Sequence, residues 1–141
     1  MIVTTSIAYV VTLVVFVLID LIWLTFVGGP MYRQALGDVL APSVRMAPAL
    51  AFYLIYPLGL VVFAVHPALN SGHVLTALLL GALYGFFTYV TYDLTNLATL
   101  RNWTIAVTMI DIAWGCALGG ATAALTVVVT PAIQAALGGS A

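Results

Sequence analysis

The sequence predicts an all-α integral membrane protein, a bundle of four membrane-spanning helices with both termini on the extracytoplasmic side. The 141 residues are 65% hydrophobic and only 5% charged, whereas a soluble domain carries about 25% charged residues. Four apolar stretches are each long enough to cross a bilayer, which takes about 20 residues. Lipid must therefore be the solvent for most of the outer surface.

The chain is interpreted as a single domain, residues 1–141, whose spans cover about 2–27, 46–65, 73–100 and 103–129. The N-terminal segment lacks the basic region of a signal peptide, so we expect the first span to be retained.

Turn-forming residues predict where these spans end. The first should stop at Gly28-Gly-Pro30. The second should stop at His66-Pro67, with a kink at Pro57, and the fourth should close at Pro131. Residues 28–45 have an amphipathic middle, which favours either a short helix in the headgroup region or an ordinary loop with one helical turn.

The arginines predict the orientation. Arg33 and Arg45 belong to the 28–45 loop, and Arg101 belongs to the tight 101–103 turn. Two spans separate these connections, so both lie on one side of the membrane. The opposite side has no arginine or lysine, and the positive-inside rule then assigns the arginine-bearing side to the cytoplasm.

Three aspartates fall inside predicted spans. Asp20 lies eight residues before Gly28, Asp93 eight before Arg101, and Asp111 eight after Trp103. With a rise of about 1.5 Å per residue, each carboxyl is about 12 Å from the arginine-bearing side. Intramembrane carboxylates usually face a bundle interior and mark function, although each could instead serve as hydrogen-bonding glue between helices.

Neighbouring residues at helical spacing extend this acidic cluster. The pattern D-x-x-W occurs twice. Tyr89 and Asn96 share the helix face of Asp93, and further tyrosine and threonine hydroxyls, including that of Tyr92, form an adjoining stripe. The tryptophans also fit the ordinary enrichment of aromatic residues at membrane interfaces. The predicted ligand-binding set is Asp20, Trp23, Tyr89, Tyr92, Asp93, Asn96, Asp111 and Trp114.

Glycines four residues apart predict which helices pack together. Gly81-x-x-x-Gly85 and Gly115-x-x-x-Gly119 lie in the third and fourth spans. Such pairs allow two helix backbones to approach closely. We therefore expect these two spans to be neighbours.

The sequence argues against nucleic-acid binding and against an internal disulfide. It contains no basic run that would grip nucleic acid. Cys116 is the only cysteine, so no disulfide forms within the chain.

Four motifs resemble those of a family of small bacterial membrane proteins that is described only as a domain of unknown function. They are D-L-I-W at 20–23, F-Y-L-I-Y-P-L-G-L at 52–60, T-Y-D-L-T-N-L-A-T at 91–99 and D-I-A-W-G at 111–115. The resemblance implies four spans and a multi-pass location in the bacterial inner membrane. It assigns no activity, substrate or catalytic residue.

The first functional hypothesis is a polar pocket that faces the cytoplasm and binds or moves a proton, a cation or a small polar or cationic ligand. We expect such a protein to form a homo-oligomer in the lipid bilayer, to need no cofactor, and not to be an enzyme.

A second hypothesis is an enzyme that modifies a lipid or isoprenoid, with Mg²⁺ held by Asp20, Asp93 and Asp111. A third is an accessory subunit of a larger membrane complex.

Overall fold

The structure is a computed structural model that describes residues 2–138, and the described part of the chain is helical with no β-strand. Four continuous helical segments are long and apolar enough to cross a membrane: Val3–Val39, Met46–Ser71, Val74–Thr99 and Ile105–Ala136. The predicted all-α fold with four spans is therefore confirmed. The elements, in order, are α1 (Ile2–Trp23), η1 (Leu24–Gly28), α2 (Gly29–Leu36), η2 (Gly37–Val39), α3 (Met46–Leu60), η3 (Val61–Val65), α4 (His66–Ser71), α5 (Val74–Thr99) and α6 (Ile105–Ala136).

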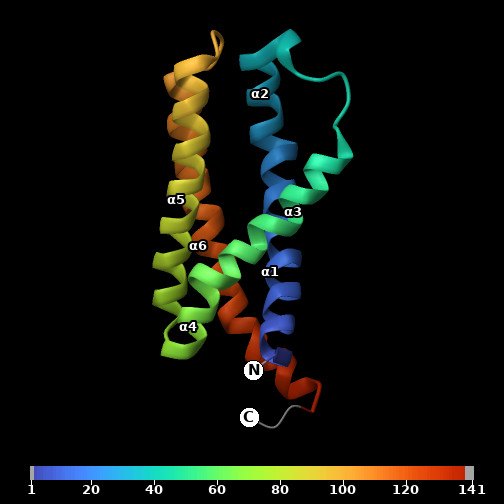
Figure 1. Cartoon of the computed structure of the whole chain (residues 1–141), viewed down its shortest axis with the longest axis vertical. Helices are drawn as coiled ribbons and strands as arrows, with labels where there is room; N and C mark the ends of the chain where they lie inside the picture. Colours follow the sequence, from blue (N-terminus) through green and yellow to red (C-terminus); the bar gives the residue numbers. More distant parts are fainter. Residues whose placement is uncertain (1, 139–141) are drawn as a thin grey trace.

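Figure 1 shows α5 and α6 side by side, with α1 and α2 forming one long rod and α3 crossing the bundle obliquely. The second span therefore starts against α1 and finishes with η3 and α4 against α5. Both termini lie at one end of the bundle, here called the terminal end. The opposite end holds α2 and the turn between α5 and α6, and is called the α2 end.

The first helix does not end at Gly28-Gly29-Pro30, so the predicted stop is wrong. The backbone switches to a π-helical turn, η1, and then continues into α2 with Pro30 in the first helical turn, where proline is tolerated. A side chain at Gly29 would overlap the carbonyl of Leu24, and one at Gly28 would overlap the indole of Trp23. The glycines therefore accommodate the π turn, and the amphipathic segment after them is a helix.

The second helix also continues beyond its predicted end at His66-Pro67. Pro57 lies inside α3, and the chain then passes through the π-helical η3 into α4, whose first turn contains Pro67. The actual end is at Gly72, which adopts a left-handed φ of 72° and donates its N–H to the carbonyl of Ala68 at 3.0 Å. Glycine adopts this conformation at no steric cost.

The fourth helix continues through Pro131 to Ala136, so the predicted closure at Pro131 is wrong too. Its last turn is tied to α1 because the Gln134 amide donates a hydrogen bond to the hydroxyl of Thr4 at 2.7 Å. Tertiary contact at this point outweighs the local preference of proline to end a helix.

The glycine pairs pack α5 against α6 as predicted. A side chain at Gly81 would overlap the carbonyl of Gly119, and one at Gly85 would overlap the carbonyl of Gly115. The two backbones are thus in direct contact at two levels. This pair is the most extensively packed part of the bundle.

Candidate ligand-binding site

The three intramembrane aspartates are buried in the bundle and approach one another. The exposed fractions of Asp20, Asp93 and Asp111 are 4%, 0% and 1%. All three carboxyl groups lie within electrostatic range of the Tyr89 hydroxyl on α5. Three different helices therefore place their carboxyl groups around one tyrosine hydroxyl, which is consistent with the eight-residue spacings.

Asp20 on α1 is held by a tyrosine of the second span. The Tyr53 hydroxyl donates a hydrogen bond to Asp20 Oδ2 at 2.7 Å, and the indole of Trp114 lies nearby. Trp114 in turn stacks on Trp23, with ring centroids 4.4 Å apart and planes 5° from parallel. The repeated D-x-x-W pattern thus forms a single stacked pair across α1 and α6.

Asp111 on α6 accepts a short hydrogen bond from the hydroxyl of Tyr32 on α2. Its other oxygen, Oδ2, is buried and has no hydrogen-bond partner. Neither oxygen of Asp93 has a well-formed hydrogen bond, and this side chain lies near the Trp103 indole and within electrostatic range of Asp111. Buried polar groups are normally hydrogen-bonded, so these carboxyl oxygens are exceptions to the usual pairing of buried polar groups.

Two adjoining cavities open beside these carboxylates. One has a volume of about 320 Å³ and contains Asp111, and the other has a volume of about 300 Å³ and contains Asp20. Tyr32, Phe52 and Tyr89 line both and form the boundary between them. Each cavity is lined by five aromatic side chains and one carboxylate, and none of the described residues that line either cavity is basic.

The predicted site residues take three kinds of position. Those that line a cavity are Asp20, Trp23, Tyr89, Tyr92 and Asp111. Asp93 and Trp114 line neither cavity. Asp93 lies within electrostatic range of Asp111, and Trp114 stacks on Trp23. Asn96 lines neither cavity, and it interacts with Tyr92 on its own helix.

Sequence reasoning missed four aromatic residues of the site: Tyr32, Phe52, Tyr53 and Tyr56. Tyr32 lies in the 28–45 connection, which the Gly-Gly-Pro segment predicts to be outside the first span. The other three occur in the motif F-Y-L-I-Y-P-L-G-L, where two tyrosines precede a proline inside an apolar span. Two tyrosines shortly before a proline that interrupts the span are the signal from which the sequence could have predicted these residues.

The arrangement does not fit a metal ion held by all three acids. Among residues 2–138, no three side chains of histidine, cysteine, aspartate or glutamate are grouped so that they could hold a metal ion. Asp20, Asp93 and Asp111 therefore do not form a carboxylate cage for Mg²⁺ in this conformation. Each cavity instead combines a single carboxylate with aromatic side chains.

A family model described as a predicted membrane protein, DUF2177, matches residues 5–128. The chain belongs to this family. The match covers all three aspartates and both cavities beside them, so the DUF2177 region includes the whole candidate site. No curated protein and no solved structure matches the chain.

Proposed function

We propose that this protein binds a small organic cation, such as a substituted ammonium ion, in the two cavities beside Asp20 and Asp111. The observation that carries the proposal is the lining of each cavity, which combines one carboxylate with five aromatic rings and no basic group. The faces of aromatic rings attract cations, and aromatic cages recognise quaternary ammonium groups.

The carboxylates provide the counter-charge for such a ligand. Asp111 keeps one oxygen free, and Asp93, which lacks a well-formed hydrogen bond, adds a second acidic group behind it. A buried charge is tolerated when it is paired, so a bound cation would compensate both groups at once. An anionic ligand would be repelled by ionised carboxylates at the same place.

The volumes set the size of the ligand. Cavities of about 300 Å³ are at the lower limit of small-molecule sites. Because Tyr32, Phe52 and Tyr89 separate the two cavities, one compact cation fits in either, and a longer one must pass between these rings. Tetraethylammonium is therefore a suitable probe.

The proposal is tested by isothermal titration calorimetry of tetraethylammonium into the purified full-length protein. We expect Asp111→Asn and Asp20→Asn each to weaken binding at least about tenfold, because each removes a full negative charge from a cavity wall. Asp38→Asn is the matched control, since Asp38 is exposed in η2 and lines neither cavity. The proposal is wrong if the protein does not bind the probe, or if all three variants bind it equally.

A further inference from the structure

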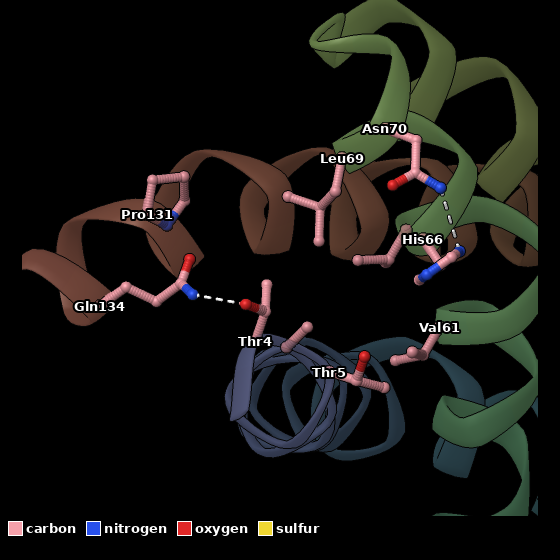
Figure 2. A pocket seen from close by; sticks show the side chains of 10 residues that line it. Thr4, Thr5, Val61, His66, Leu69, Asn70, Pro131 and Gln134 are labelled. Atoms are coloured by element: carbon pink, nitrogen blue, oxygen red, sulfur yellow. Dashed lines mark hydrogen bonds between the residues drawn. The ribbon is translucent and has the colours of Figure 1, made fainter. Parts of the chain in front are cut away.

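A third cavity lies at the terminal end of the bundle, and its lining residues differ from those of the acidic site. It has a volume of about 440 Å³ and is bounded by α1, the second span and α6. Figure 2 shows its polar side chains: Gln134 points toward Thr4, and Asn70 is hydrogen-bonded to His66. The lining offers hydroxyl, amide and imidazole groups, and none of its residues is acidic or basic apart from this histidine.

The first and second spans line the terminal cavity and both acidic cavities, and α5 contributes to the acidic cavities only. The second span contributes Tyr56 to the acidic side and Val61 to the terminal side. The fourth span contributes Asp111 at one level and Gln134 at the other. The first and second spans therefore connect the terminal cavity to the acidic cavities.

An apolar layer separates the two sides, and its packed cluster continues through Ala64 and Val65 to the wall of the terminal cavity. Phe16, Leu60 and Leu118 have an exposed fraction of 0% and belong to one packed cluster with Tyr56. The rings of Phe16 and Tyr56 stack with their centroids 4.8 Å apart. Tyr56 also lines the cavity of Asp111, so this stack forms the floor of the acidic site.

Buried threonine side chains lie on the terminal side of this layer. Thr12 of α1 donates a hydrogen bond to the Thr126 hydroxyl of α6 at 3.2 Å, and both side chains are completely buried. Thr122, one turn closer to the layer on α6, is also completely buried and its hydroxyl has no hydrogen-bond partner. These hydroxyl groups extend from the apolar layer toward the terminal cavity.

The second span carries the features of a hinge at the level of the layer. Pro57 lies within α3, and the π-helical η3 begins directly after Leu60. Proline and π-helical turns interrupt the regular hydrogen-bond ladder and allow a helix to bend. The α5–α6 pair, in contrast, is fixed by backbone contact at its glycines.

We infer that the terminal cavity is the second opening of a path along which the cation crosses the bundle, with the stacked Phe16 and Tyr56 as its gate. The inference rests on the proposed function, because the same cation occupies the acidic site. Bending of the second span at Pro57 and η3 separates Tyr56 from Phe16 and joins the two sides. The cation then moves from the carboxylates to the hydroxyl and amide groups of the terminal cavity.

The experiment measures counterflow of radiolabelled tetraethylammonium in liposomes that contain the full-length protein. Gln134→Lys places a positive charge in the terminal cavity, and we expect about tenfold slower counterflow. Gln134→Glu should change the rate in the opposite direction. Leu137→Lys is the matched control, because Leu137 is 72% exposed and outside the cavity, and it should leave the rate unchanged.

Calorimetry on the same variants separates the two proposals. Since Gln134 is on the far side of the layer, the affinity of the acidic site for the probe should stay within twofold in each variant. Binding without counterflow, or a rate that Gln134→Lys leaves unchanged, overturns the transport path and leaves the proposed function intact. Failure of the unmodified protein to bind the probe overturns both.

Discussion

Replacing Asp93 by asparagine is expected to stabilise the protein while it weakens cation binding. In the free protein neither carboxyl oxygen of Asp93 has a well-formed hydrogen bond, and Asp111 Oδ2 is unpartnered. An unsatisfied buried group costs about 1–3 kcal/mol. The substitution replaces the buried carboxyl group by an amide that can also donate a hydrogen bond and removes an acid within electrostatic range of Asp111, so we expect the free energy of unfolding to rise by about 1–3 kcal/mol.

The measurement is denaturant unfolding of detergent-solubilised protein, followed by helical circular dichroism, with Asp38→Asn as the control. Asp38 is exposed, so its substitution should change the free energy of unfolding by less than about 0.5 kcal/mol. The same samples are titrated with tetraethylammonium, whose affinity should fall in Asp93→Asn. A loss of stability in Asp93→Asn would refute the reasoning, because it would show that the carboxylate is structural.

Two further substitutions test the framework of the site. Gly85→Ala should lower the free energy of unfolding by about 1–3 kcal/mol, because the added methyl group overlaps backbone that cannot move aside. Gly120→Ala, whose new methyl group meets its nearest atom at 3.0 Å, should be tolerated much better in the same unfolding assay. Tyr32→Phe should cost about 1–3 kcal/mol through loss of the hydrogen bond to Asp111. Faster hydrogen exchange in α2 would report this loss, and unchanged exchange would contradict the role of that bond.

The parts of the fold that sequence predicted are those set by hydropathy and by spacing within one helix. The four spans follow from the length of the apolar stretches. The convergence of the three aspartates follows from equal distances to the arginine-bearing side, and the α5–α6 contact follows from glycines four residues apart. Each of these depends only on helix geometry, which is the same in every α-helix.

The parts that sequence did not predict depend on departures from regular helix. Glycine and proline at residues 28–30 and proline at residue 67 usually end helices, yet here π-helical turns carry the chain past them. A continued first helix brings Tyr32 to Asp111, and no local pattern announces a contact between residues so far apart. The sequence did not predict the terminal cavity for the same reason, since the second span was expected to end at His66-Pro67 and the fourth at Pro131, whereas both helices continue and line this cavity.

The π-helical turns η1 and η3 lie in the first and second spans. This distribution bears on both the proposed binding site and the proposed path. Asp93 and Asp111 stand on the rigid α5–α6 pair, whereas the hydroxyl donors Tyr32 and Tyr53 stand on helices that contain a π turn or a proline. The proposed cation, held by the free Asp111 Oδ2, would share each carboxylate with the tyrosine that donates a hydrogen bond to the same group. We therefore expect occupation of the site to weaken the contacts that Tyr32 and Tyr53 make, which would favour bending of the second span.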